Sequence, residues 1–219
     1  MAELNGPRRA PESGDAKYMV VFVHGYGADG NDLIGLADPL AEHLPDTVFH
    51  SPNAPQHCTG NPMGYQWFPI PWLDGSSEAE AHEGLAAASA LLNEWLDETM
   101  LAEGVDAAHT ILVGFSQGTM MALHIAPRRE EPVAGVVGFS GRLLLPEALE
   151  IEAVSQMPIL LVHGDADEVV PPQSLPEAAD GLTKAGFEVY THISKGTGHG
   201  IAGDGLQLAL QFIRQQFGL

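Results

Sequence analysis

The sequence predicts an α/β fold with a mainly parallel central sheet and helices on both of its faces. Three short runs of β-branched and apolar residues, at 18–24, 110–115 and 159–164, are typical of strands buried on both faces. Segments with the period of a helix lie between these runs, and strands that alternate with helices form parallel sheets. Such sheets bind ligands beyond the carboxyl ends of their strands. We therefore expect functional residues in the loops that follow the strands.

The first half of the chain supplies an arm, a strand, a helix and an unusual loop. Residues 1–16 are predicted to be an N-terminal arm or an edge strand, and residues 17–219 a single domain, because no linker-like change of composition divides them. After the strand at 18–24, Asn31 or Asp32 is expected to cap a helix that reaches Leu44. A short strand follows at 47–51. Residues 52–75 hold five prolines and several aromatic residues without a regular period, which predicts an ordered loop that covers something.

The second half repeats the alternation of helix and strand. Ser77 and Glu80 form a capping box, which predicts a helix of about five turns up to Thr99. The strand at 110–115 leads into a helix that Pro127 ends. Further strands are predicted at 133–139, 159–164 and 188–193, with helices at 175–185 and 206–217. Residues 142–146 are not expected to begin a helix.

The charge and the cysteine content exclude several classes of partner. The chain has 29 acidic and 9 basic residues, a net charge of −20, so nucleic acid and anionic lipid surfaces are repelled. Cys58 is the single cysteine, which excludes an internal disulfide and a thiolate metal cluster. The sequence shows no secretion signal and no apolar run long enough to cross a bilayer. We therefore expect a cytoplasmic protein without stable membrane insertion.

Residues 114–118, Gly-Phe-Ser-Gln-Gly, carry the strongest functional signal. The two glycines permit a sharp turn from the strand at 110–115 into a helix, which would lift the hydroxyl of Ser116 above the sheet. The flanking strand and helix distinguish this pentapeptide from a chance match, and they predict Ser116 as a nucleophile. Ser140 is a weaker candidate, because in Gly-Phe-Ser-Gly at 138–141 no residue separates the serine from the second glycine. Cys58 lies in the proline-rich loop and not at such a turn.

A serine nucleophile needs a base, and the base needs a group that orients it. His199 follows the last predicted strand between glycines, and is the only one of the ten histidines so placed. Asp165 and Asp167 both follow the strand at 159–164. The reach of the loop favours Asp167 as the acid, because Asp165 is close enough to the strand to cap local backbone. His24 and His163 precede glycines at strand ends and are expected to fix their turns.

The site is also expected to contain an oxyanion hole and to hold no metal or cofactor. The developing oxyanion needs two donors, and the main-chain N–H groups of Gln117 and Tyr26 are the expected pair. The histidines show no spacing typical of a zinc site, so neither a metal nor a cofactor is expected.

Four motifs in order resemble the phospholipase/carboxylesterase family of α/β hydrolases. They are Val-His-Gly-Tyr-Gly at 23–27, the pentapeptide at 114–118, His-Gly-Asp-Ala-Asp with Val-Val-Pro at 163–171, and Gly-His at 198–199. The resemblance spans roughly residues 20–217. It implies the α/β-hydrolase fold, Ser116, Asp167 and His199 as a catalytic triad, and Tyr26 and Gln117 as the oxyanion hole.

The resemblance also bears on the substrate. The chain departs from the family at Thr119, where glycine is frequent, and at Tyr26, where leucine is commoner; the tyrosine is expected to alter the acyl pocket. The chain is too short for a large cap domain, which implies an open, shallow cleft. Residues 63–68 look like the family's loop beside the active site. We expect Trp67, Phe68 and Val169 to bind the acyl or alcohol part of a substrate, although each could instead belong to the core of its loop.

The function expected from these residues is that of a serine carboxylesterase that acts on short- to medium-chain esters. The same triad would serve an acyl-protein or acyl-CoA thioesterase or a lysophospholipase, so these remain alternatives. A catalytically inactive α/β hydrolase that binds a ligand is the alternative outside the enzymes. Exposed aromatic residues beside a shallow cleft would permit a homodimer, but nothing in the sequence requires one.

Overall fold

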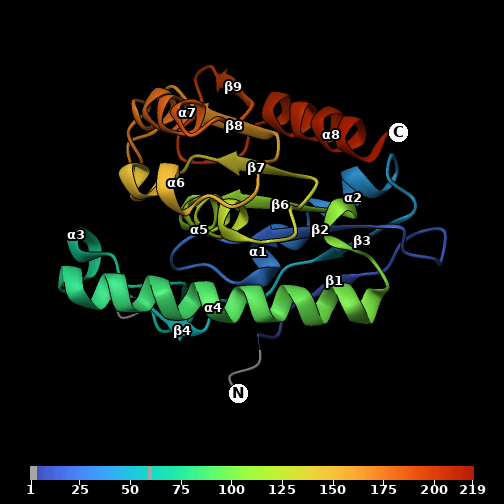
Figure 1. The fold of residues 1–219 in the computed structure, drawn as a ribbon, viewed down its shortest axis with the longest axis horizontal. Coiled ribbons are helices and arrows are strands. Elements are labelled where there is room, and N and C mark those ends of the chain that lie inside the picture. The colour runs from blue at the N-terminus through green and yellow to red at the C-terminus, as the bar shows by residue number, and fades with distance from the viewer. Residues whose placement is uncertain (1–3, 59–60) are drawn as a thin grey trace.

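A seven-stranded, mainly parallel sheet forms the centre of the computed structural model, which describes residues 4–58 and 61–219 (Figure 1). The strands lie in the order β1-β3-β2-β6-β7-β8-β9. Every neighbouring pair is parallel except β1 and β3, which confirms the predicted sheet. The strand bounds are Arg8–Arg9 (β1), Tyr18–Val23 (β2), Thr47–His50 (β3), Thr110–Phe115 (β6), Gly135–Phe139 (β7), Ile159–Gly164 (β8) and Val189–Ser194 (β9).

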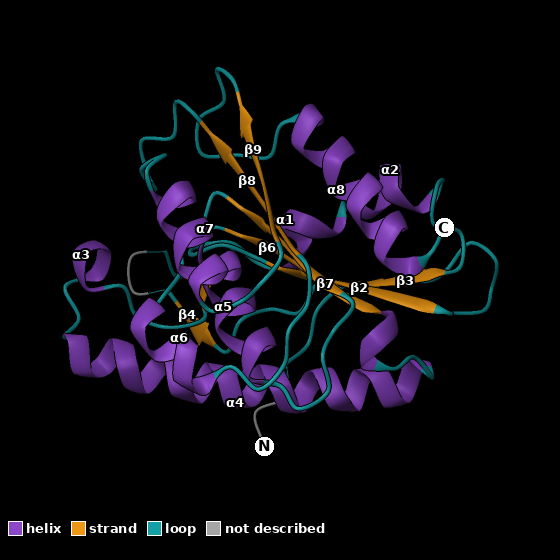
Figure 2. Ribbon diagram, turned by 45° about the horizontal axis from the view of Figure 1, so that its top comes forward, coloured by secondary structure: helices purple, strands orange, loops and turns teal. Residues whose placement is uncertain are grey.

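Helices cover both faces of this sheet, as expected (Figure 2). The helices on one face are α4 (Glu78–Glu103), α5 (Gln117–Ile125), α6 (Pro146–Glu152) and α7 (Ser174–Lys184). Those on the other face are α1 (Gly30–Ile34), α2 (Ala37–Ala41) and α8 (Gly203–Phe217). Side chains alternate along a strand, so in β2 Met19 and Val21 pack on the α4 side while Val20 and Phe22 pack on the α8 side.

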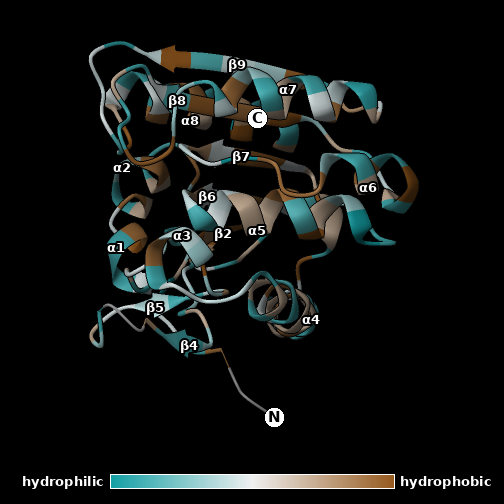
Figure 3. Ribbon diagram, turned by 90° about the vertical axis from the view of Figure 1, so that its left-hand side faces the viewer, coloured by the Kyte–Doolittle hydropathy of each residue, from teal (hydrophilic) through white to brown (hydrophobic). Residues whose placement is uncertain are grey.

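Helix α4 shows how local sequence sets an element. The Glu80 N–H donates to the Ser77 hydroxyl oxygen at 3.2 Å, and the Ser77 N–H donates to the Glu80 carboxylate at 2.7 Å, so the predicted capping box is present. The helix continues past Thr99 to Glu103 and ends at Gly104, whose φ of 70° suits glycine. Figure 3 shows α4 nearly end-on, with hydrophobic and hydrophilic residues alternating around its turns.

Two helix predictions were wrong in detail. The single helix expected up to Leu44 is divided into α1 and α2, and Asp29 caps α1 in place of Asn31 or Asp32. Pro39 explains the division, because its missing N–H and its ring prevent a continuous helix through that position. Helix α6 begins at Pro146, where no helix was expected. Proline is favoured in a first helical turn, where its missing N–H costs nothing.

The segment 52–75 is more regular than predicted, although residues 59 and 60 lie outside the described part. It contains a two-stranded antiparallel hairpin, β4 (Gln56–His57) with β5 (Tyr65–Gln66), and a short helix, α3 (Pro71–Asp74). Within the N-terminal segment 1–16, whose first three residues are also outside that part, Arg8–Arg9 form the edge strand β1. Two 3-10 helices, Ala107–His109 and Ala126–Arg128, complete the elements.

Candidate active site

Ser116 lies at a strained turn between strand β6 and helix α5. Its φ of 53° and ψ of −114° belong to a region that non-glycine residues rarely adopt, at a cost of about 1–3 kcal/mol. The neighbouring positions 114 and 118 must be glycine, because the surrounding main chain leaves no room for a Cβ atom. A Cβ atom on Gly118 would lie 1.7 Å from the carbonyl oxygen of Val23, and one on Gly114 would lie 2.5 Å from the main-chain nitrogen of Thr119. The pentapeptide therefore packs directly against β2, with Ser116 at the carboxyl end of the central strand.

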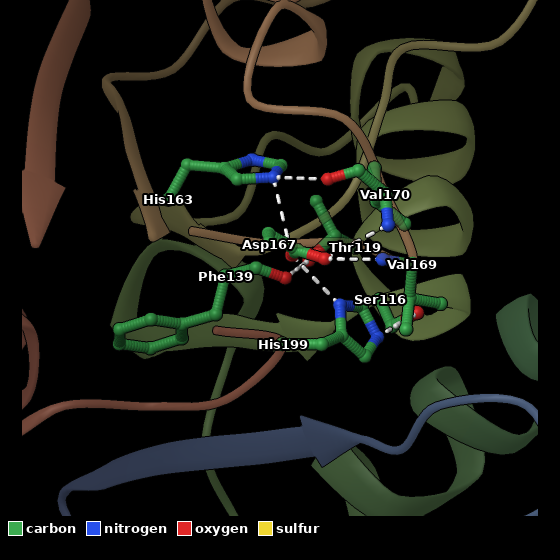
Figure 4. A network of polar contacts seen from close by, with 8 residues as sticks. All are labelled: Ser116, Thr119, Phe139, His163, Asp167, Val169, Val170 and His199. Atoms are coloured by element: carbon green, nitrogen blue, oxygen red, sulfur yellow. Dashed lines mark hydrogen bonds and ion pairs between the residues drawn. The ribbon is translucent and has the colours of Figure 1, made fainter. Parts of the chain in front are cut away.

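His199 bridges Ser116 and Asp167, as Figure 4 shows. The Nε2 atom of His199 is 3.0 Å from the Ser116 hydroxyl oxygen, and its Nδ1 atom is 2.8 Å from a carboxylate oxygen of Asp167. The three residues come from loops after β6, β8 and β9, whose carboxyl ends share one edge of the sheet. A neutral imidazole whose Nδ1–H donates to Asp167 leaves Nε2 free to accept the serine proton.

The carboxylate of Asp167 is fully buried and well hydrogen-bonded. One oxygen faces His199, and the other accepts the main-chain N–H groups of Val169 and Val170, both at 2.9 Å. Burial alone would raise the pKa of Asp167, but the hydrogen bonds from His199, Val170 and Val169 outweigh burial, and the pKa lies below its ordinary value. The carboxylate is therefore charged at neutral pH, as an acid that stabilises an imidazolium must be.

His163 is a neighbour of Asp167 for which the sequence suggested only a local role. Its ring is buried, and its Nε2 atom lies 2.9 Å from the carbonyl oxygen of Val170 and 3.3 Å from an Asp167 carboxylate oxygen. Both neighbours are acceptors, so Nε2 carries a proton that it shares between them. His163 thus fixes its turn, as predicted, and it also contacts the acid. Its position four residues before Asp167 was the only signal in the sequence.

Asp165 forms no hydrogen bond or ion pair with His199 or Ser116 among the described residues. Its carboxylate accepts the main-chain N–H of Gly196 at 2.6 Å, so it holds the loop that carries His199. Neither alternative nucleophile forms a hydrogen bond with His199 among the described residues. Ser140 is buried with no hydrogen-bond partner for its hydroxyl among the described residues. Cys58 is buried, and burial raises the pKa of its thiol, which keeps the thiol protonated.

The turn that carries Tyr26 lies against the nucleophile. A Cβ atom on Gly25 would be 3.3 Å from the Cβ atom of Ser116. His24 holds this turn: its Nδ1 atom lies 2.8 Å from the Gly25 carbonyl oxygen, and its Nε2 atom accepts the Ala54 N–H at 2.9 Å. This bonding requires a neutral ring, and burial lowers the pKa of His24 accordingly. The main-chain N–H groups of Tyr26 and Gln117 donate to no other described residue, so both are free for an oxyanion.

Trp67 and Phe68, expected to contact substrate, lie in the core, and this expectation is corrected. Trp67 is fully buried and Phe68 nearly so. The side chain of Gln117 binds the main chain of both, accepting the Trp67 N–H at 2.9 Å and donating to the Phe68 carbonyl at 2.7 Å. The Trp67 indole belongs to the core on the α4 side of the sheet, and its ring centroid lies 5.5 Å from that of His24. These two residues therefore anchor the 52–75 segment to the helix that begins after Ser116.

A cavity of about 560 Å³ opens beside Ser116 and His199. Its wall is mostly apolar or aromatic, and its rim is exposed at Trp72, Leu73 and Val169. Val169 therefore lines the cavity as expected, and so does Tyr26, whose hydroxyl donates to Asp74 at 3.4 Å. The wall residues are Tyr26, Ile70, Trp72, Leu73, Ser116, Met120, Arg142, Val169, Val170, Pro171 and His199. No further domain covers this edge of the sheet in the described part of the chain.

Within 4–58 and 61–219, no three histidine, cysteine, aspartate or glutamate side chains gather as metal ligands would. No helix in these ranges is long and apolar enough to cross a bilayer.

Comparisons with known proteins find similar esterases and thioesterases. A family model described as phospholipase/carboxylesterase matches residues 8–217. Esterase YpfH of Escherichia coli is 29% identical over 91% of this chain and 83% of that protein. Acyl-protein thioesterase 1 of Gibberella zeae is 26% identical over 90% of this chain and 89% of its own. The crystal structure of esterase PE8 has a TM-score of 0.92 and 45% identity, and covers 97% of this chain and 99% of that one.

Proposed function

This chain belongs to the phospholipase/carboxylesterase family of α/β hydrolases, and we propose that it is a serine carboxylesterase that acts through an acyl-enzyme. The observation that carries this proposal is the continuous contact from Asp167 through His199 to Ser116, at 2.8 and 3.0 Å. These distances are those of hydrogen bonds that a proton transfer requires. The family contains esterases and thioesterases, so the bond that is cleaved is the specific part of the proposal.

The arrangement supplies each step of ester hydrolysis. The hydroxyl oxygen of Ser116 bonds to the acyl carbon of the ester while His199 Nε2 takes the hydroxyl proton. The π electrons of the ester carbonyl move to the carbonyl oxygen, which becomes an oxyanion. The N–H groups of Tyr26 and Gln117 bind this oxyanion. When the oxyanion collapses, the bond to the alcohol breaks and the alcohol takes the proton from His199. Water then attacks the acyl-enzyme by the same route, and the acid is released with Ser116 restored.

The cavity favours short- to medium-chain esters. A volume of about 560 Å³ with walls such as Ile70, Leu73 and Val169 accommodates a small apolar acyl or alcohol group. The cytoplasmic location remains a prediction, and the sequence permits a homodimer without requiring one.

Thioester hydrolysis is the second candidate, because several relatives are named acyl-protein thioesterase 1. The same triad would cleave both bonds. Parallel assays with the ester p-nitrophenyl butyrate and the thioester S-phenyl thiobutyrate therefore separate the two activities. A higher kcat/KM for the thioester would move the assignment to the thioesterases. A folded protein that a fluorophosphonate probe does not label would instead indicate a catalytically inactive binder.

Substitution of Ser116 tests the proposal directly. We expect Ser116→Ala to reduce hydrolysis of p-nitrophenyl butyrate by about 10⁴-fold or more and to abolish fluorophosphonate labelling. Ser140→Ala is the matched control: it removes the rival hydroxyl, also from a residue with positive φ, and should keep the labelling. Full activity of a folded Ser116→Ala protein would refute the assignment.

A further inference from the structure

Arg142 is a cation in the wall of the cavity that holds Ser116 and His199. It lies on the loop between β7 and α6, and its Cζ atom is 5.8 Å from the centroid of the Trp72 ring. An arginine stacked on an aromatic face is held in place while its N–H groups stay available in the plane of the guanidinium.

The backbone of this loop is strained at both ends. Ser140 has a φ of 47° and Leu145 a φ of 49°, conformations that cost a non-glycine residue about 1–3 kcal/mol each. The start of the loop is fixed by hydrogen bonds from the Ser140 N–H to the Val162 carbonyl at 2.9 Å and from the Thr119 hydroxyl to the Phe139 carbonyl at 2.8 Å. These hydrogen bonds maintain the strained backbone, and they fix the start of the loop that places Arg142 in the same cavity wall as Ser116.

Arg142 has no acidic partner, although the chain carries 29 acidic residues and only 9 basic ones. Among the described residues it makes no ion pair within 4 Å, and no aspartate or glutamate lines the cavity. Of the other eight basic residues, five are paired with carboxylates, namely Arg8, Arg9, Lys17, Arg128 and Arg129. The remaining three, Lys184, Lys195 and Arg214, are exposed to solvent, whereas Arg142 is half-buried in the cavity wall. A half-buried guanidinium with five donors and no protein acceptor is available to an anion that enters the cavity.

We propose that Arg142 binds an anionic group of the substrate, so that the preferred substrates are esters that carry a carboxylate or phosphate besides the bond that is cleaved. Arginine binds both groups through two parallel N–H···O bonds. The site is needed because the net charge of −20 repels anions, and a single unpaired cation beside the nucleophile supplies the local attraction. This inference rests on the proposed function and specifies its substrate.

Matched ester pairs test it. The p-nitrophenyl monoester of adipic acid carries a carboxylate on the acyl side, and p-nitrophenyl hexanoate is its neutral counterpart. On the alcohol side, 2-(hexanoyloxy)ethyl phosphate pairs with 2-(hexanoyloxy)ethanol. We expect Arg142→Gln to lower the ratio of kcat/KM for the anionic ester to kcat/KM for the neutral ester by about 10–100-fold in one pair. The affected pair shows which of the two anionic substrates Arg142 binds. Arg142→Lys keeps the charge but loses the two parallel N–H donors of the guanidinium. Its ratio of kcat/KM should lie between those of the wild type and Arg142→Gln.

Arg214→Gln is the control for net charge, because Arg214 is an exposed residue of α8 far along the chain from the cavity. It changes the overall charge equally and should leave both ratios within about twofold, since exposed charges are screened. Adipate should also inhibit the wild type competitively, and Arg142→Gln should weaken that inhibition about tenfold. Unchanged ratios and unchanged inhibition in Arg142→Gln would overturn the role of Arg142 while neutral esters are still cleaved. A wild-type protein that cleaves no ester would instead overturn the proposed function.

Discussion

The indole N–H of Trp67 donates a hydrogen bond of 3.0 Å to the carbonyl oxygen of His24, the residue that precedes the turn with Tyr26. The main-chain N–H of the same tryptophan donates to the side chain of Gln117. Trp67 therefore touches both segments that supply the proposed oxyanion donors, and it joins them through the core.

Trp67→Phe removes the indole donor and keeps a large aromatic ring. The His24 carbonyl then loses a buried partner, which should cost about 1–3 kcal/mol of unfolding free energy. We expect kcat/KM to fall by a similar factor for acetate, butyrate and octanoate esters, because the change acts on the turn and not on the acyl pocket. Urea unfolding and the chain-length series measure the two effects. Trp95→Phe, on α4, is the control, and a loss confined to long chains would contradict the structural role of Trp67.

Asp167→Asn leaves the geometry of the triad but removes the charge that selects the His199 tautomer. We expect kcat to fall by about 10³–10⁴-fold, as for other triads. Asp165→Asn is the matched comparison, because among the described residues the carboxylate of Asp165 accepts a hydrogen bond from the Gly196 N–H and not from His199. This substitution should lower kcat about tenfold at most. Steady-state kinetics on p-nitrophenyl butyrate separates the two aspartates. Equal losses in both variants would show that the loop, and not the carboxylate beside His199, is what matters.

His163→Gln and His163→Ala test the contact behind the acid. The Nε2–H of His163 lies between Asp167 and the Val170 carbonyl, so its loss should loosen the orientation of the carboxylate. We expect kcat to fall about tenfold in the alanine variant with little change in KM, and to recover partly in the glutamine variant, whose amide retains a donor. A change in KM alone would indicate a role in the cavity wall, because Val169 and Val170 line it.

The meeting of Ser116, Asp167 and His199 could be predicted from the sequence because it depends on topology. Parallel strands bring their carboxyl ends to one edge, and Ser116, Asp167 and His199 each follow such a strand. The role of Trp67 depends instead on two hydrogen bonds to residues 43 and 50 positions away along the chain. No local period encodes them, so the sequence leaves open whether an aromatic residue in an irregular segment contacts substrate or belongs to the core.

Helix boundaries and the cavity charge illustrate the same limit. The division of α1 from α2 depends on Pro39, which a pattern of leucines does not reveal. The unpaired state of Arg142 depends on which of the 29 acidic residues lie nearby in the fold. Composition alone gives their number and not their places.

His124 makes the stability of the fold depend on pH. Burial, followed by the nearby charge of Arg128, lowers the pKa of His124 to about 4, against about 6.5 in an unfolded chain. Between these values the unfolded state binds more protons, so stability is fully present above pH 6.5 and is lost as the pH falls towards 4. The half-buried ring is partly screened, which leaves an expected loss of about 1–2 kcal/mol between pH 7 and 4.5.

The variant His124→Leu should show a smaller loss over the same range in urea unfolding at pH 7 and 4.5. His82→Leu, at an exposed position of α4, serves as the control and should follow the wild type. Identical pH dependence in wild type and His124→Leu would contradict this source of acid sensitivity.

Salt should stabilise this protein. The chain carries a net charge of −20, and self-repulsion of that size opposes the compact state. Sodium chloride also weakens the ion pairs of the basic residues, but exposed pairs contribute only about 0–1 kcal/mol each, so screening of the repulsion prevails. We expect Tm to rise by about 5 °C between 0.05 and 0.5 M NaCl and then to level off, since the Debye length is by then only about 4 Å.

Differential scanning fluorimetry measures how steeply Tm rises with salt. A Glu130→Gln/Glu131→Gln variant removes two adjacent exposed charges beside Asp97 and Asp106. It should begin at a higher Tm and show a shallower rise. A Tm that falls with salt in the wild type would mean that the ion pairs outweigh the repulsion.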